Sequence, residues 1–209
     1  GDSYELITKS IPSLVHAVFS TRTKQGSLFC PISDYLNRYY KTDYPVLPHI
    51  VKKFSGTTQN LRGSLGIPEE ATVFGSYAGK NQFNIPFVHK AVEKTAELNK
   101  NIYFLFMNIE PFNQTKRKNI IFLKKNTSPE YKEQFINSCD AMLHARDDGE
   151  TFGLSIAEFS SKNKPVISWK PDYLHCFSYK LEESLRRLRG KKHRYAEAHL
   201  DFLGKTALS

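Results

Sequence analysis

The chain has 209 residues and a formal net charge of +9 at pH 7, with a pI of about 9.4. Hydrophobic residues make up 40% of it, which excludes wholesale disorder and predicts a sizeable core. The excess of basic residues favours an anionic ligand, a polyanion or an acidic membrane surface, and the charge alone does not choose among them.

The first part of the chain predicts only short elements. The sequence indicates a strand over Leu14–Phe19 and a short helix over Pro31–Tyr40, with Ser33 as its N-cap. Pro45 and Pro48 bracket the next two residues and predict a crossing segment or linker. We therefore place a domain boundary between residues 45 and 46.

From residue 61 onward, strands and helices are predicted to alternate regularly. A short helix ends at Gly66 and Pro68, and the apolar run Ile102–Met107 is typical of a buried strand. The further predicted strands are 71–76, 119–123, 140–145 and 165–169, and the further predicted helices are 85–98, 129–138 and 151–162. This alternation predicts an α/β fold with a doubly wound parallel sheet, covered by helices on both faces.

Cysteine usage and the chain's apolar runs indicate a location. Cys30, Cys139 and Cys176 are scattered, and no Cys-x-x-Cys occurs, so we expect free thiols in a reducing compartment rather than disulfides or a zinc site. The sequence shows no basic-then-apolar leader and no apolar run of transmembrane length. These observations favour a cytoplasmic protein.

The most informative stretch joins two glutamates, Glu150 and Glu158, with seven residues between them. If a helix begins near Thr151 as N-cap, Glu150 lies at the helix mouth and Glu158 about 10 Å further along the axis. The free N–H groups at that mouth suit a diphosphate, and Gly153 permits a close backbone approach. Carboxylates accept hydrogen bonds from paired sugar hydroxyls.

A bare pair of glutamates at this spacing is usually two solvated side chains on an amphipathic helix. Here the pair is flanked by a strand on each side and follows a Gly-Glu-Thr-Phe-Gly turn. This context favours a nucleotide-sugar site at the carboxyl edge of a parallel sheet.

The segment from Asp140 to Arg146, the stretch 149–159 and the sequence Lys164–Ile167 together resemble the donor-binding half of GT-B glycosyltransferases. The likeness is to the large, mostly retaining family that includes mannosyl-, glucosyl- and galactosyltransferases. Residues 61–75 resemble that family's entry into its second Rossmann-like domain. The resemblance implies transfer of a hexose from a nucleoside-diphosphate sugar to a glycan, glycoprotein or other acceptor. It also implies retention at the anomeric carbon, with neither a metal nor another cofactor.

The resemblance also implies roles for individual residues. Glu150 would contact the transferred sugar as the catalytic residue, and Glu158 would bind the ribose. The family usually places an arginine and a lysine after the first strand of this domain, but here Ser76 lies where that arginine is expected. Lys80 and Arg146 are therefore the expected partners of the diphosphate. The other expected donor-binding residues are Thr151, Phe152, Gly153, Leu154, Gly75 and Ser76.

In these terms the chain has three parts. Residues 1–45 correspond to the end of an N-terminal, acceptor-side domain or its remnant, and residues 46–175 to the nucleotide-sugar-binding Rossmann-like domain. Residues 176–209 form a predicted basic helical tail, whose cations include Arg186, Arg187, Arg189, Lys191, Lys192 and Arg194. The tail is either a solvated helix or a contact with an anionic membrane surface or with the acceptor. Its few aromatic residues give no reason to expect nucleic acid.

Two alternatives to an active transferase remain open from the sequence. One is a sugar-nucleotide-binding module that is inactive without the missing N-terminal domain. The other is a basic interaction protein that uses its tail on membranes or nucleic acid. Asp147 and Asp148 are weak evidence for a metal, because a single acidic pair in a loop is common.

Overall fold

The computed structural model describes residues 11–113 and 115–168. Their contacts divide the chain into two units. In its described part, the smaller unit comprises residues 11–50 and 150–154. The larger unit comprises residues 51–113, 115–149 and 155–168. The predicted basic tail lies outside the described residues, and the predicted three-part domain division stays a prediction.

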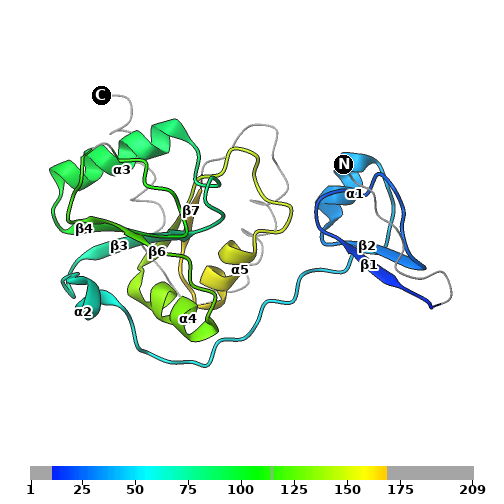
Figure 1. Ribbon diagram of the computed structural model, residues 1–209, viewed down its shortest axis with the longest axis horizontal. Helices are drawn as coiled ribbons and strands as arrows, with labels where there is room; N and C mark the ends of the chain where they lie inside the picture. Colours follow the sequence, from blue (N-terminus) through cyan, green and yellow to red (C-terminus); the bar gives the residue numbers. More distant parts are fainter. Residues whose placement is uncertain (1–10, 114, 169–209) are drawn as a thin grey trace. The chain divides into compact units, whose positions relative to one another are not determined.

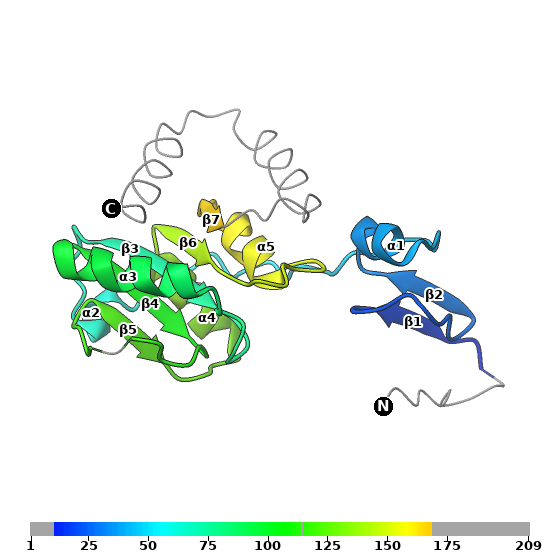
Figure 2. The same ribbon diagram turned by 90° about the horizontal axis from the view of Figure 1, so that it is seen from above.

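The smaller unit contains two short strands and one helix. Strands β1 (Leu14–Ala17) and β2 (Leu28–Pro31) pair in parallel, and helix α1 (Asp34–Tyr40) follows them (Figure 2). Strand β1 and helix α1 confirm the sequence prediction, whereas β2 was not predicted. Its buried side chains, with those of the following turn and helix, form a small core of Phe29, Cys30, Ile32 and Leu36.

The larger unit contains a five-stranded parallel sheet with the strand order β5-β4-β3-β6-β7, and Figure 2 labels each of these strands. This confirms the predicted α/β Rossmann-like fold. The strands are β3 (Thr72–Tyr77), β4 (Ile102–Met107), β5 (Ile120–Leu123), β6 (Ala141–His144) and β7 (Val166–Ser168). The helices are α2 (Arg62–Leu65), α3 (Pro86–Leu98), α4 (Pro129–Ser138) and α5 (Leu154–Ser161).

Helices cover both faces of this sheet, with α3 on one side and α4 and α5 on the other (Figure 1). Strand β4 is buried on both faces of the sheet, which explains why its sequence is apolar throughout. Its Phe104 and Phe106 pack into the cluster that includes residues of α3, while Leu105 and Met107 pack into the cluster that includes residues of α4 and α5. A strand that is buried on both faces has no polar side of its own.

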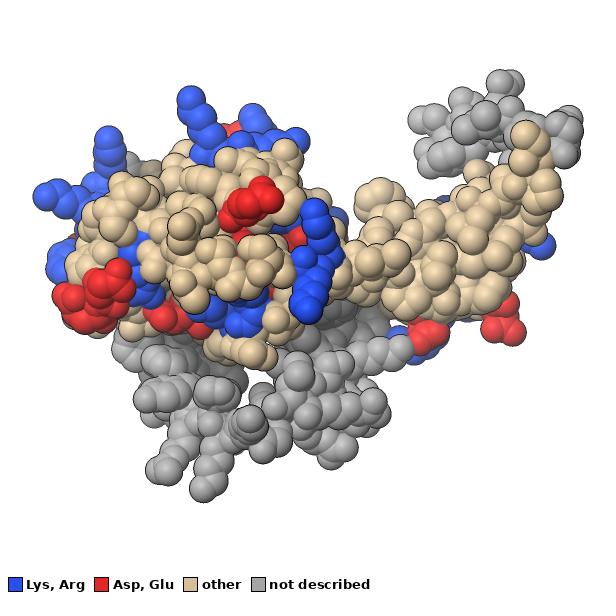
Figure 3. Space-filling model, turned by 90° about the horizontal axis from the view of Figure 1, so that it is seen from below, with Lys and Arg blue, Asp and Glu red and all other residues tan. Residues whose placement is uncertain are grey.

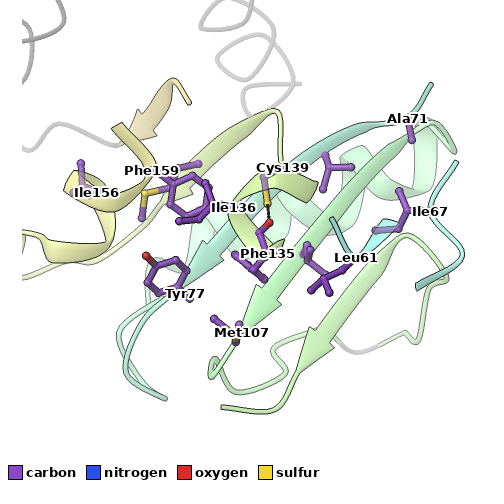
Figure 4. Packing of buried hydrophobic residues seen from close by; sticks show 13 residues of the cluster. Leu61, Ile67, Ala71, Tyr77, Met107, Phe135, Ile136, Cys139, Ile156 and Phe159 are labelled. Carbon is purple, nitrogen blue, oxygen red and sulfur yellow. Dashed lines mark hydrogen bonds between the residues drawn. The ribbon is translucent and has the colours of Figure 1, made fainter. Parts of the chain in front are cut away.

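The cluster beneath α4 and α5 carries most of the packing near the candidate site (Figure 4). Phe135 and Phe159, both fully buried, project from the two helices, and the Tyr77 ring lies against both of them. Cys139 donates from its thiol to the Phe135 carbonyl at 3.2 Å. The end of strand β3 is therefore fixed by aromatic contacts to both helices.

The buried side chain of Arg62 connects helix α2 to the sheet. Arg62 pairs with Asp140 at 2.9 Å and also donates to the carbonyls of Ser138, Glu69 and Ala71. The same Asp140 carboxylate accepts the Val73 N–H at 2.7 Å. These bonds satisfy a guanidinium that would otherwise be costly to bury, and they tie α2 to the starts of β3 and β6.

Candidate functional site

The candidate site residues of the larger unit lie near the carboxyl ends of the central strands. Strand β3 ends at Tyr77, helix α4 begins at Pro129 after β5, and helix α5 follows β6. Ligands of open α/β sheets bind at this edge, because the loops that leave it diverge and the helix N-termini point toward it.

Glu158 on α5 is the central carboxylate of this edge. It is buried, with 6% of its surface exposed, and it has two donors among the described residues. The Tyr77 hydroxyl donates to its Oε2, and the Lys132 ammonium lies 2.6 Å from its Oε1. Since a carboxylate offers about four lone pairs, these bonds leave acceptor capacity for a ligand.

Lys132 and Tyr77 also contact each other. The Lys132 ammonium lies 5.1 Å from the centre of the Tyr77 ring, within the range of a cation–π contact. Burial and the neighbouring negative charge of Glu158 both raise the pKa of Tyr77 far above its ordinary value. Tyr77 therefore keeps its proton and remains a hydrogen-bond donor to Glu158.

A second buried glutamate lies beside Lys132 in the chain but has a different surrounding. Glu133 accepts from the Ser55 N–H and hydroxyl, from the Gly56 N–H and from Lys162 at 2.9 Å. Burial by itself would raise the pKa of Glu133, but these donors lower it to about 2. This carboxylate has the environment of a structural anchor for the segment that enters the larger unit.

The loops after β3 and β6 are tied together. Asn84 donates to the Asp147 carboxylate at 2.6 Å, accepts the Asp147 N–H at 3.0 Å, and donates its own N–H to the Ala145 carbonyl. Asp147 thus has a partner in the protein, and it fixes the loop that contains Arg146. Arg146 is partly buried in that loop.

Lys80 lies in the loop after β3 and is largely exposed. Its ammonium is 3.1 Å from the Glu110 carboxylate, which is also largely exposed. Exposed pairs of this kind contribute about 0–1 kcal/mol, so Lys80 can exchange Glu110 for a phosphate at little cost.

Gly75 and Ser76 lie within strand β3, which continues to Tyr77. The strand predicted over 71–76 is confirmed as β3, which continues one residue further because Tyr77 pairs with Met107 of β4. A Cβ on Gly75 would meet the Cys139 thiol at 2.2 Å, so packing against α4 accounts for this glycine. Ser76 is buried.

The stretch Glu150–Leu154 belongs to the smaller unit. The Thr151 carbonyl accepts a 2.7 Å hydrogen bond from the Ser33 hydroxyl, and the Phe152 ring packs edge-on against His49. His49 also contacts His16, the histidine of β1. Glu150 is partly buried in this stretch.

The predicted helix start at Thr151 was wrong. Helix α5 begins at Leu154, because Gly153 has a φ of +76°, which lies outside the helical region. Thr151 is therefore not the N-cap, and Glu150 does not adjoin the first helical turn. Glu158 lies in the middle of the helix.

The structure thus brings Glu158 together with two residues that the sequence analysis missed, Tyr77 and Lys132. The only signals for them were the position of Tyr77 at a strand end and that of Lys132 in the first turns of a helix. Glu150 lies in the smaller unit and Glu158 in the larger one.

Across residues 11–113 and 115–168, no group of three or more histidine, cysteine, aspartate or glutamate side chains is arranged to hold a metal ion. Within the same ranges, no helix is long and apolar enough to cross a membrane. On the face of the larger unit drawn in Figure 3, basic and acidic side chains are interspersed.

No family model and no curated protein matches the chain. Several solved structures are similar to the chain. The glycosyltransferase WaaG, involved in lipopolysaccharide biosynthesis, is similar with a TM-score of 0.53 and 18% identity, over 76% of this chain and 52% of that one. Anabaena Alr3699/HepE, in complex with UDP and glucose, is similar with a TM-score of 0.52 and 16% identity, over 68% of this chain and 44% of that one.

A third structure, a TarM variant of S. aureus in complex with UDP and sugar ligands, has a TM-score of 0.50 and 8% identity, over 70% of this chain and 30% of that one. The chain thus spans about half the length of the first two structures, and less of the third. At these identities the likeness concerns the fold. The described chain has the Rossmann-like α/β fold of GT-B glycosyltransferases.

Proposed function

We propose that the chain is the donor-binding part of a sugar-nucleotide-dependent glycosyltransferase. One observation carries the proposal: Glu158 is a buried carboxylate at the carboxyl edge of the parallel sheet, and it retains acceptor capacity. A buried carboxylate with lone pairs to spare suits the paired hydroxyls of a ribose. The shared fold with glycosyltransferases, one of them bound to UDP, supports this assignment.

In this proposal the donor is a nucleoside-diphosphate hexose. Glu158 accepts from the ribose, and the backbone groups of Thr151, Phe152, Gly153 and Leu154 contact the sugar and phosphates. Lys80 and Arg146 neutralise the diphosphate, beside the strand residues Gly75 and Ser76. No divalent cation is needed, because these cations and the helix N-terminus supply the positive potential.

Glu150 is the proposed catalytic residue. Its carboxylate stabilises the positive charge that develops on the hexose as the bond to the diphosphate breaks, and the sugar passes to a glycan or glycoprotein acceptor with retention. The motivating observation is the spacing of eight positions between Glu150 and Glu158, the two glutamates to which the family resemblance gives the sugar and the ribose. We further propose a cytoplasmic location, with the basic tail as a peripheral membrane contact.

A second candidate function follows from the length of the matches. Because the chain spans about half of the similar structures, it is alternatively a sugar-nucleotide-binding module that transfers nothing by itself. Both candidates predict binding of the donor, and they differ in turnover.

Two measurements test the proposal. Calorimetric titration with UDP-glucose and GDP-mannose, together with the free nucleotides, should reveal saturable binding of at least one pair. An assay of donor hydrolysis and of transfer to a glycan then separates an enzyme from a binding module. Absence of binding to every nucleotide and sugar nucleotide tested would refute both candidates.

A further inference from the structure

Lys132 is the one cation of the described residues that touches Glu158, and no sequence motif pointed to it. Its ammonium lies 2.6 Å from Glu158 Oε1 and over the Tyr77 ring. The Lys132 side chain is 21% exposed and that of Glu158 is 8% exposed. The pair therefore lies at the border between the core and the edge where a ligand is proposed to bind.

We infer that Lys132 is a positioning residue of the nucleotide site, which holds Glu158 in the orientation that binds the ribose. The inference rests on the proposed function. It deepens that function, because it assigns the ribose contact to a set of three side chains rather than to one glutamate.

The geometry gives each member of this set a separate task. Tyr77 donates to Oε2 of Glu158 and Lys132 donates to Oε1, so each carboxylate oxygen has its own donor. A glutamate held in this way keeps one orientation, and its remaining lone pairs point in fixed directions. Preorganised acceptors bind hydroxyl groups without first losing side-chain freedom.

The charge of Lys132 matters as well as its geometry. Without the ammonium, Glu158 would be a buried carboxylate with a single hydrogen-bond donor and no charge partner among the described residues. Such a group relaxes toward water or takes up a proton, and either change removes the preformed acceptor. Lys132 has three donor hydrogens, so it also has hydrogens for an oxygen of the bound nucleoside.

A neighbouring ion pair provides the comparison. Lys162 and Glu133 lie 2.9 Å apart with a similarly buried lysine, 19% exposed, and a more deeply buried glutamate. All acceptor oxygens of Glu133 serve the Ser55–Gly56 segment and Lys162. The Lys162 pair is therefore structural, and removing it should affect stability without affecting the ribose contact.

The test measures how much binding affinity each variant gains from a ribose hydroxyl of the nucleotide. The wild-type chain, Lys132→Met, Lys132→Arg and Lys162→Met are titrated with UDP, 2′-deoxy-UDP and 3′-deoxy-UDP, with the GDP and ADP series used if UDP does not bind. The wild type should bind the ribonucleotide roughly tenfold or more tightly than at least one deoxy form, as expected for hydrogen bonds to a charged group. In Lys132→Met this preference should fall to about twofold or less.

The other variants separate a positioning role from a structural one. Lys132→Arg should keep most of the preference for ribose, and Lys162→Met should keep all of it while its melting temperature falls. If Lys132→Met does not fold, Lys132→Gln, which keeps a polar donor without the charge, takes its place in the same titration.

The outcomes are distinguishable. If the wild type prefers the ribonucleotide and Lys132→Met (or Lys132→Gln) keeps that preference in full, the role of Lys132 is refuted and the proposed function survives. An equal loss in Lys162→Met would also refute it, since the effect would then be one of general stability. If the wild type binds no nucleotide, the proposed function itself fails.

Discussion

The Tyr77 hydroxyl donates a hydrogen bond to Oε2 of Glu158, although 81 positions separate the two residues in the chain. This contact joins the end of strand β3 to the middle of helix α5. The contact also places the Tyr77 phenol against a buried carboxylate. Burial and the negative charge of Glu158 both raise the pKa of this phenol. The consequences extend to both stability and binding.

The stabilising contribution of Tyr77 should depend on alkaline pH. In the unfolded chain the phenol ionises near its ordinary pKa of about 10, while in the folded chain it keeps its proton. The contribution is therefore complete below about pH 10 and declines as the pH rises above that value. Urea unfolding of the wild type and Tyr77→Phe between roughly pH 8 and 11 should show a difference in unfolding free energy that shrinks above pH 10. A difference that stays constant would contradict the raised pKa.

Glu133 should produce the opposite behaviour in acid. Its donors lower its pKa to about 2, below the value of about 4.3 in an unfolded chain. Its contribution is thus complete above pH 4.3 and is lost as the pH falls toward 2. The difference in unfolding free energy between the wild type and Glu133→Gln should shrink over this window.

Glu70 is exposed and provides a control for the acid series. The substitution Glu70→Gln removes one negative charge and leaves the contacts of Glu133 in place, and its unfolding free energy is measured over the same window. If both variants respond alike to acid, the shift is a property of the whole charge distribution rather than of the contacts between Glu133, Ser55 and Lys162.

Packing between Gly75 and Cys139 can be tested by a rescue experiment. In Gly75→Ala the new Cβ would lie 2.2 Å from the Cys139 thiol, so the variant should lose about 1–3 kcal/mol of stability, as overpacked cores do. The double variant Gly75→Ala/Cys139→Ala removes the colliding sulfur and should recover part of that loss. Thermal unfolding of both single variants and the double variant measures the coupling. Strict additivity would show that Gly75 is needed for another reason.

Much of the larger unit's fold could be predicted from the sequence, because strands buried on both faces are continuous apolar runs. Ile102–Met107 is such a run, and it became strand β4. The start of α5 was mispredicted, since Thr151 is a good N-cap by residue type and the positive φ of Gly153 is invisible in sequence. Strand β2 was missed because its four residues have no alternating pattern.

The environment of Glu158 could not be predicted for a different reason. The carboxylate itself stood out through its spacing from Glu150, but its partners come from a strand and a helix distant in the chain. Adjacent residues on α4, Lys132 and Glu133, join different networks, and helical periodicity does not reveal which network each one joins.

Donor binding should not require a divalent cation. Lys80, Arg146 and the N-terminus of α5 are proposed to supply the positive charge that a metal would otherwise provide. Titration with the sugar nucleotide in excess EDTA should give the same dissociation constant as titration without chelator, and added Mg²⁺ or Mn²⁺ should change it less than about threefold (below 1 kcal/mol). Loss of binding in EDTA, restored by either metal, would contradict this expectation.

The central claim is that Glu158 binds the ribose and Glu150 the sugar of one donor. Its most direct test is a side-by-side titration of the wild type, Glu158→Ala and Glu150→Gln with the free nucleotide and the intact sugar nucleotide. Glu158→Ala should weaken the binding of both ligands by roughly tenfold to a hundredfold, since both contain the ribose. Glu150→Gln should leave the nucleotide affinity nearly unchanged and weaken only the sugar nucleotide, with a larger fall in any transfer rate. Unchanged nucleotide affinity in Glu158→Ala, or equal losses for both ligands in Glu150→Gln, would contradict the account.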